Sequence, residues 1–259
     1  MSVESSGLNI AVLVKQVPPA TAVSIDPVSR KAVVGQERIT NTYDVYGIGA
    51  AIGLKERFGG SVTVISAGPP GVREILLRGL ATGADDAILV DLPEHNEVES
   101  SRMARILADL VAERGFDLVI AGQSTEDIET GQTGLQVAEL LGWPHVTLVT
   151  HIDQVDGELH VSRDSEGTKE VLGVRPPAVL MVLTGRDEEQ RHPTLRGMMA
   201  AKKKPIDVVT IAGDGESPAL TWDEPVAVER EASGVIVRDT PAPEAARQLV
   251  EWLRERKLI

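Results

Sequence analysis

Val45-Tyr-Gly-Ile-Gly-Ala-Ala-Ile-Gly-Leu-Lys-Glu-Arg-Phe-Gly-Gly-Ser-Val-Thr-Val-Ile-Ser66 is an amphipathic helical segment that passes directly into a strand-like run. The helical pattern covers residues 45–57, and Gly59-Gly60 stands where a helix needs a left-handed C-terminal cap. Residues 61–66 are a short apolar run of strand length. A helix that passes through a glycine turn into a buried strand is typical of an α/β protein with a parallel sheet.

The same alternation continues on both sides of this stretch. Apolar runs of strand length stand at 10–14, 87–90 and 118–121, and amphipathic segments stand at 72–82, 97–114 and 130–141. Gly83 and Gly115 again follow helical segments and precede the next strand. We therefore predict an α/β fold with a mostly parallel sheet whose strands are joined by crossover helices.

The pattern changes after residue 141. Strand-like runs stand at 146–149, 158–162, 170–174 and 178–183, and Asp156-Gly157 is a hairpin turn dipeptide. This predicts a mixed or antiparallel extension packed beside the parallel sheet. Residues 185–204 are polar and irregular, and they are followed by a strand at 206–211, an extended arm at 214–239 and a helix at 243–256. We divide the chain into an α/β domain, 1–212, which includes loop 185–205, and a C-terminal arm and helix, 213–259.

The composition excludes several classes of protein. The chain has 26 basic and 39 acidic residues, and its net charge of −13 argues against a nucleic-acid partner. It has no cysteine, which excludes a disulfide framework and any cysteine-ligated metal. No export signal and no apolar run of roughly 20 residues is present. We therefore expect a protein of the cytoplasm, or of an organelle matrix, without direct membrane insertion.

Four turns at the ends of predicted strands are candidates for a ligand site. They are Lys15–Pro18, Ser66–Pro69, Gly83–Asp86 and Gly122–Gly134. In an open α/β sheet, ligands bind outside the carboxyl ends of the strands, where backbone amides and helix N-termini face a phosphate. The last turn is rich in small residues and hydroxyls, which can surround a phosphate. No G-x-G-x-x-G and no Walker lysine motif is present, so another kind of nucleotide site is predicted.

The residues suggest binding and not bond making. The five histidines are scattered, and none has the spacing of a helical metal pair. No G-x-S-x-G elbow occurs. The chain has one cationic cluster, Lys202-Lys203-Lys204, which follows the apolar residues Leu195, Met198 and Met199. Apolar side chains beside positive charge predict a docking surface for another protein.

Several motifs together resemble the β subunit of electron transfer flavoproteins (FixA-like family) over nearly the whole chain. They are Lys15-Gln16-Val17-Pro18, Asn41-Thr42-Tyr43-Asp44, Gly83-Ala84-Asp85, Gln132-Thr133-Gly134 and Ala200-Ala201-Lys202-Lys203-Lys204-Pro205. The resemblance implies a fold like that of the adenine-nucleotide α-hydrolases. It also implies an electron carrier, not an enzyme, that forms a heterodimer with an α subunit on which residues 213–259 pack. Its donors would be flavin-dependent dehydrogenases, and its acceptor a quinone-linked oxidoreductase or another redox protein.

The resemblance also implies two cofactors and the residues that bind them. FAD is shared with the α subunit, and this chain binds a second adenine nucleotide, either AMP or a second FAD. The residues that match the family's nucleotide-binding segments are Lys15, Gln16, Val17, Asn41, Tyr43, Asp44, Ser66, Ala67, Gly68, Gly122, Gln123, Ser124, Thr125, Asp127, Thr130, Gly131, Gln132, Thr133 and Gly134. The residues that match its docking loop are Leu195, Met198, Met199, Lys202, Lys203 and Lys204.

Two segments bear on the choice between AMP and FAD. Asn41–Asp44 and Asp127–Gln132 are similar to segments of the electron-bifurcating branch, which binds a second FAD, and Thr130 is placed to meet a diphosphate. In contrast, Ile128 replaces a glycine of that branch, and Thr133 is the residue of AMP-binding members. These segments favour FAD and leave AMP open. His192-Pro193 also departs from the family's docking loop, which leaves the partner's identity open.

Two alternatives of other classes remain. A stand-alone ATP-using enzyme of the related fold needs a serine- and glycine-rich loop after the first strand. Here that turn, Lys15–Pro19, has no glycine and two prolines. A regulatory module that binds an adenine nucleotide would explain the ligand site but not Leu195 with its neighbouring lysines.

Overall fold

The computed structural model describes residues 7–92, 99–155, 157–184, 191–211, 223, 226–228 and 234–259. The chain forms two compact units, Met1–Pro225 and Val226–Ile259. The predicted domain boundary after residue 212 lies outside the described residues.

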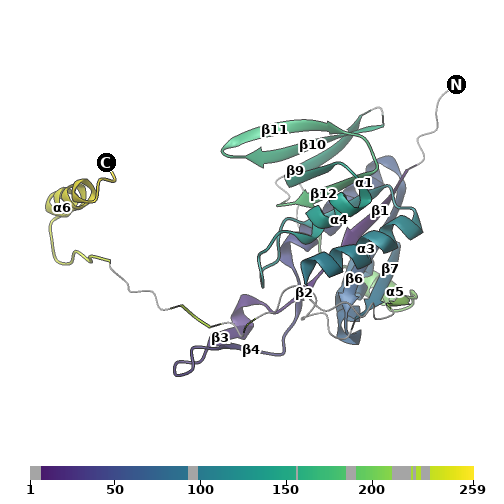
Figure 1. The fold of residues 1–259 in the computed structure, drawn as a ribbon, viewed down its shortest axis with the longest axis horizontal. Helices are drawn as coiled ribbons and strands as arrows, with labels where there is room; N and C mark the ends of the chain where they lie inside the picture. Colours follow the sequence, from purple (N-terminus) through teal and green to yellow (C-terminus); the bar gives the residue numbers. More distant parts are fainter. Residues whose placement is uncertain are drawn as a thin grey trace. The chain divides into compact units, whose positions relative to one another are not determined.

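The first unit is built on a nine-stranded sheet in the order β11-β10-β9-β12-β8-β1-β6-β7-β13 (Figure 1). The strands from β9 to β13 in this order are parallel, whereas β10 and β11 are antiparallel to their neighbours. Their bounds are β1 Leu8–Leu13, β6 Gly60–Gly68, β7 Asp86–Asp91, β8 Leu118–Gly122, β9 His145–Val155, β10 Glu158–Ser165, β11 Thr168–Val174, β12 Ala178–Val182 and β13 Asp207–Thr210.

The antiparallel extension is part of this sheet, which corrects the prediction that it packs beside the sheet. Strand β12 lies between β8 and β9, and it pairs with both in parallel. All five residues of β12 are buried, as expected of a central parallel strand. The predicted hairpin joins β9 to β10, where Val155 pairs with Glu158.

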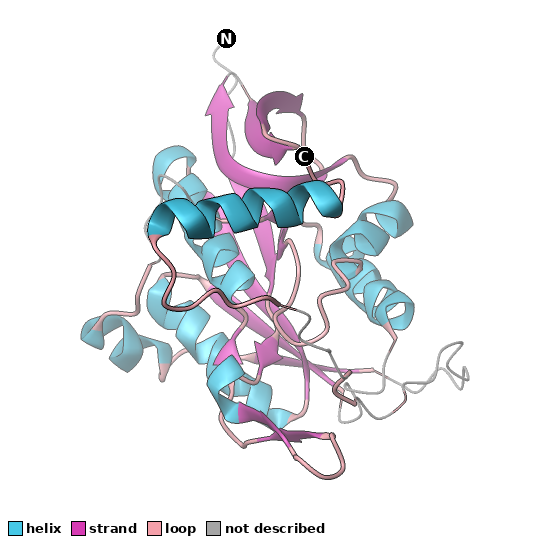
Figure 2. Cartoon of the chain, turned by 90° about the vertical axis from the view of Figure 1, so that its left-hand side faces the viewer, coloured by secondary structure: helices cyan, strands magenta, loops and turns pink. Residues whose placement is uncertain are grey.

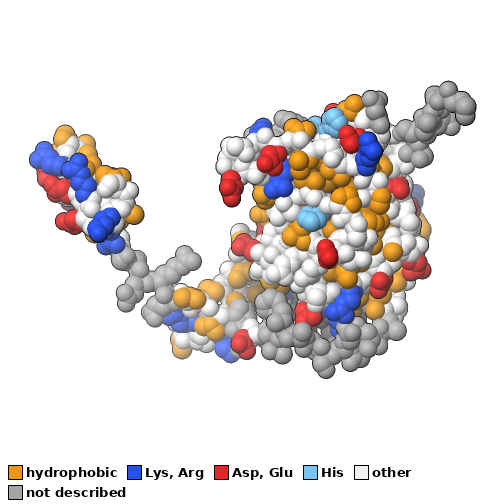
Figure 3. Space-filling model, turned by 45° about the horizontal axis from the view of Figure 1, so that its top comes forward, with side chains coloured by type: hydrophobic (Ala, Val, Ile, Leu, Met, Phe, Trp, Pro, Cys, Tyr) orange, Lys and Arg blue, Asp and Glu red, His pale blue; other side chains and the backbone are white. Residues whose placement is uncertain are grey.

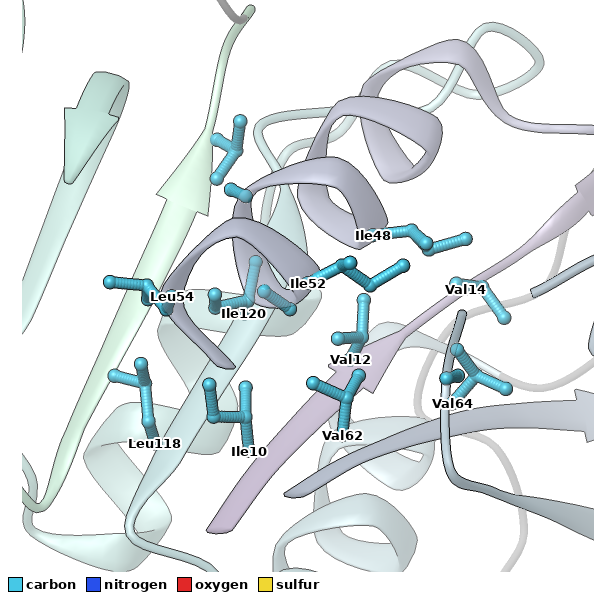
Figure 4. Close-up of a cluster of buried hydrophobic side chains, with 14 of the residues drawn as sticks. Ile10, Val12, Val14, Ile48, Ile52, Leu54, Val62, Val64, Leu118 and Ile120 are labelled. Carbon is cyan, nitrogen blue, oxygen red and sulfur yellow. The ribbon is translucent and has the colours of Figure 1, made fainter. Parts of the chain in front are cut away.

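Helices cover both faces of the sheet, because successive residues of each strand point to opposite faces. Ile10 and Val12 of β1 pack in one buried cluster with the first two helices, and Ala11 and Leu13 pack in the other cluster with the next two. Figure 4 shows the first cluster, with Ile48 and Ile52 above the strands. The helices are α1 Thr42–Phe58, α2 Arg73–Thr82, α3 Ser100–Arg114 and α4 Thr133–Leu141.

A short helix, α5 Leu195–Ala201, lies in the segment that we predicted to be irregular. The hydroxyl of Thr194 accepts a hydrogen bond from the backbone N–H of Gly197 at 3.0 Å and caps the helix. Gly197 lies against α2, where an added Cβ would stand 2.2 Å from the carbonyl oxygen of Ala81. Seven residues are too few to show a clear helical periodicity of apolar residues, so the prediction missed this helix.

Two small antiparallel ribbons were also not predicted. They pair β2 Gln16–Val17 with β5 Ile39–Thr40, and β3 Val23–Ile25 with β4 Ala32–Val34. The β3–β4 ribbon extends away from the large sheet (Figure 1). Short 3₁₀ turns complete this unit at η1 Ala20–Ala22 and η2 Pro70–Val72.

The described residues of the second unit contain one helix, α6 Ala242–Glu255, close to the predicted bounds (Figure 2). Leu249 is 56% exposed, and none of the helix residues is buried. The guanidinium of Arg256 stacks on the ring of Trp252 at 4.7 Å. Trp222, which we predicted to pack on a partner, lies outside the described residues.

On the face of the first unit seen in Figure 3, Lys and Arg side chains lie in separate spots among acidic and apolar ones. Among the described residues, no helix is long and apolar enough to cross a membrane.

Candidate functional site: a cavity at the carboxyl ends of the parallel strands

A cavity of about 310 Å³ opens at the carboxyl ends of β1, β6 and β8, on the side covered by α3 and α4. This is the edge at which open α/β sheets bind ligands. Eleven of the predicted cofactor-binding residues line it: Lys15, Asp44, Ala67, Gly122, Ser124, Thr125, Thr130, Gly131, Gln132, Thr133 and Gly134.

Another group of predicted residues supports the loops around the cavity. The side chain of Asn41 donates to the carbonyl of Ser124 at 2.9 Å and accepts from the backbone N–H of Glu126 at 3.2 Å. The Ser66 hydroxyl donates to the carbonyl of Val14 at 2.7 Å. The side-chain oxygen of Gln123 accepts from the backbone N–H of Leu148 at 2.6 Å. These contacts hold the β8–α4 loop and the end of β1 in place.

The remaining predicted residues around the site also have packing roles. Gln16 donates to the carbonyl of Gly71 at 3.3 Å, and Val17 is fully buried. The carbonyl of Gly68 accepts from the N–H of Leu92 at 3.1 Å. Tyr43 lies beside Gly122 at the end of β8, because a Cβ added to Gly122 would stand 2.7 Å from the Cβ of Tyr43.

Asp44 joins the ends of two strands. One carboxylate oxygen accepts from the backbone N–H of Lys15 at 2.7 Å, and the other accepts from the backbone N–H of Gly122 at 3.2 Å. Burial raises the pKa of Asp44 to about 7, and the hydrogen bonds from Lys15, Asn41 and Gly122 oppose this rise without cancelling it. Asp44 therefore binds a proton in the folded protein at pH values where an exposed aspartate is ionised.

Lys15 is the one basic side chain among the described residues that line the cavity. Its ammonium group lies 2.7 Å from a carboxylate oxygen of Asp127. Burial raises the pKa of Asp127, but the hydrogen bonds from Lys15 and Thr125 and the charge of Lys15 outweigh burial and hold the pKa below its usual range. The ion pair fixes the position of the Lys15 ammonium beside the cavity.

Two helices begin at the cavity. Ser100 starts α3 and Thr133 starts α4, and both residues line the cavity. The Ser100 hydroxyl also lies 3.2 Å from the side-chain oxygen of Gln132 and links the two helix starts. The first N–H groups of a helix lack intrahelical partners, and the helix dipole favours an anion beside them. Lys15 and the two helix starts together provide donors for a phosphate.

The apolar wall of the cavity was missed by sequence reasoning. It is formed by Leu13, Ile65, Met103, Leu107 and Met181. Most of these side chains belong to strands and a helix whose pattern indicated core positions, and no sequence signal separates a core position from a cavity wall. An apolar wall beside phosphate donors suits a ligand with a planar ring and an anionic group.

The turn Gly83–Asp86 does not belong to this site, which corrects our prediction. It precedes β7, so it lies at the amino ends of the strands. The Asp85 carboxylate accepts from the backbone N–H of Val62 at 2.8 Å and from the ammonium of Lys55 at 2.8 Å. The turn is a structural junction.

The predicted docking residues lie at the same amino end, on and after α5. Leu195 is 73% exposed, and Met198 and Met199 are exposed with it. Lys202 and Lys203 are exposed as well. In contrast, the ammonium of Lys204 donates to the carbonyls of Ala84 and Asp85 at 2.9 and 2.8 Å, so it has a structural role.

Known proteins are similar to this chain over most of its length. A model of the electron transfer flavoprotein domain matches residues 32–214. The chain is 32% identical to the electron transfer flavoprotein subunit beta of Bacillus subtilis, over 87% of this chain and 90% of that protein. It is 31% identical to the subunit of the same name from Clostridium acetobutylicum, over 97% and 100%. It is also 32% identical to Protein FixA of Bradyrhizobium diazoefficiens, over 74% and 70%.

Proposed function

We propose that this chain, which belongs to the electron transfer flavoprotein β-subunit and FixA family, pairs with an α subunit to form a heterodimeric electron carrier. Relatives that match over most of their length carry the name subunit beta, and that name supports a partner subunit. The heterodimer takes electrons from flavin-dependent dehydrogenases and passes them to a quinone-linked oxidoreductase or another redox acceptor. Its FAD is shared between the two subunits.

The cavity carries this proposal, because its residues fit an adenine nucleotide. Lys15 and the starts of α3 and α4 hold the phosphate, and the apolar wall with Met103 and Met181 holds the adenine ring. A volume of about 310 Å³ lies at the low end for ligand cavities, which matches a mononucleotide or the adenylate part of FAD. The described residues hold no cluster of three metal-binding side chains.

We propose FAD as the nucleotide of this subunit, with AMP as the alternative. Thr130 lines the cavity close to the start of α4, where a hydroxyl suits a diphosphate. Thr133 lines the same cavity, and it is the feature that favours AMP. A second FAD, when bound, supplies a second redox centre, as electron bifurcation requires. Denaturation of the purified heterodimer releases two FAD in the first case, and one FAD with one AMP in the second.

A matched pair of variants tests the cavity itself. We expect Lys15→Met to weaken retention of the nucleotide of this subunit by about tenfold or more, because a charged hydrogen bond to phosphate is lost. Lys169→Met removes an exposed lysine of β11, outside the cavity lining, and should leave the nucleotide content unchanged. Equal nucleotide content in the two variants would contradict the assignment. A colourless protein that needs no second subunit would favour the ATP-using enzyme or the regulatory module.

A further inference from the structure

The docking segment, Arg191–Lys204, has little burial of its own to hold it in place. Its helix has seven residues, and among them Ala201 alone is buried. Leu195, Met198 and Met199, which would contact a partner, are exposed. A short helix is marginal in water without tertiary contacts. Its order therefore depends on the contacts at its two ends and on its packing against α2.

At the amino end, Arg191 forms a bidentate ion pair with Glu56 in the last turn of α1. Its two terminal nitrogens donate to the two carboxylate oxygens of Glu56, each at 2.8 Å. The hydrogen bonds from Arg191 hold the pKa of Glu56 below its usual range. Planar bidentate pairing fixes orientation as well as distance. The segment is therefore attached to α1 before it turns into α5.

At the carboxyl end, Lys204 is attached to the turn between α2 and β7. Its ammonium donates to the carbonyls of Ala84 and Asp85. That turn is itself held rigidly, because Lys55 donates to both carboxylate oxygens of Asp85, at 2.8 and 2.9 Å. Lys204 thus ties the segment to a fixed part of the domain.

Between these ends, Gly197 allows α5 to pack against the last turn of α2, as described above. A segment held at both ends and along its helix presents its three exposed apolar side chains in one arrangement. A partner then need not order the segment on binding, which removes part of the entropic cost of association.

We propose that Arg191 and Lys204 are positioning residues that hold the docking segment in its partner-binding conformation. This inference rests on the proposed function, because it assumes that the segment docks a donor dehydrogenase. The partner surface that fits is an apolar pocket bordered by carboxylates, which would receive Leu195 and face Lys202 and Lys203. The ion pair of Arg191 with Glu56 is half-exposed, and such pairs add little to global stability. Lys204 donates to two backbone carbonyls in the turn before β7. Loss of either contact should therefore affect docking more than folding.

The test uses the complete heterodimer with its flavin and a donor dehydrogenase at saturating substrate. We expect Arg191→Gln and Lys204→Gln each to raise the KM for the heterodimer about fivefold, with kcat and flavin content unchanged. Arg175→Gln is the matched control, since it breaks another exposed ion pair, with Glu158 at 3.4 Å. This control should leave KM unchanged.

A charge exchange separates positioning from a general loss of stability. The double variant Arg191→Glu with Glu56→Arg restores an ion pair of opposite direction, and we expect its KM to return toward that of the wild type. A KM that stays at the wild-type value in Arg191→Gln, while Leu195→Ala raises it, would overturn this inference and leave docking intact. An unchanged KM in Leu195→Ala would overturn the docking role and this inference together.

Discussion

The buried carboxyl of Asp44 allows a quantitative prediction for Asp44→Asn. The asparagine keeps the size of the side chain and removes its titration. In the asparagine an NH₂ group replaces one of the two carboxylate oxygens. This NH₂ group faces the backbone N–H of Lys15 or of Gly122 and cannot accept a hydrogen bond from it. That loss destabilises the variant by an amount that does not depend on pH, so the pH dependence isolates the titration itself.

The size of the pH effect follows from the pKa of about 7 in the folded protein and 3.8 in the unfolded chain. Between these values the folded state binds more protons, so the stability of the wild type falls as the pH rises toward 7. A difference of about three pKa units corresponds to about 4 kcal/mol. Relative to Asp44→Asn, the wild type therefore loses about 4 kcal/mol of unfolding free energy between pH 4 and pH 7.5.

Thermal unfolding of the purified heterodimer across this pH range measures the difference. For a chain of this size, 4 kcal/mol corresponds to a change of about 10 °C in the midpoint difference between variant and wild type. Asp127→Asn is the control, because the lowered pKa of Asp127 gives stability that is lost below about pH 4. The difference in thermal unfolding midpoint between Asp127→Asn and the wild type should stay constant from pH 4.5 to pH 7.5. A constant difference for Asp44→Asn as well would refute the reasoning.

Three further predictions follow from packing and exposure. Gly122→Ala should destabilise the protein by about 1–3 kcal/mol in denaturant unfolding, because the added Cβ would stand 2.2 Å from a carboxylate oxygen of Asp44. Gly71→Ala is the control and should be neutral, because no atom lies within 4 Å of its added Cβ. Leu195→Ala should slow reduction by the donor dehydrogenase in stopped-flow experiments and leave the flavin content unchanged, because an exposed apolar anchor is removed. Residues 213–259 should be trimmed by protease in the isolated chain and protected in the heterodimer, and equal trimming would show that they do not pack on the α subunit.

The parallel core of the fold could be predicted from the sequence, because the patterns that indicate its strands and helices are local. Strands β1, β6, β7 and β8 are largely buried apolar runs, and helices α1 to α4 each end at a glycine, such as Gly59 or Gly115. The place of β12 was not readable, because its insertion between β8 and β9 joins segments far apart in the chain. Helix α5 was missed because long-range contacts at Arg191 and Lys204 hold it, and its own seven residues carry no clear period.

The polar half of the candidate site was predictable, and the apolar half was not. Small residues and hydroxyls after β8 predict a phosphate-binding turn, and Thr130 and Gly134 do line the cavity. Met103 and Met181 line it as well, but their sequence pattern is that of ordinary core residues. Our prediction also placed Gly83–Asp86 at the site, since glycine and aspartate look alike in turns at either end of a strand.

The candidate cavity and the proposed docking segment lie at opposite ends of the parallel sheet. The cavity uses the carboxyl ends of β1 and β8, where Asp44 joins them. The docking segment is attached at the amino end, to the end of α1 and to the turn before β7. No side chain in the described part of the chain belongs to both regions. Substitutions without shared contacts usually have additive effects. Substitutions at the cavity and in the docking segment should therefore have additive effects on the free energy of unfolding.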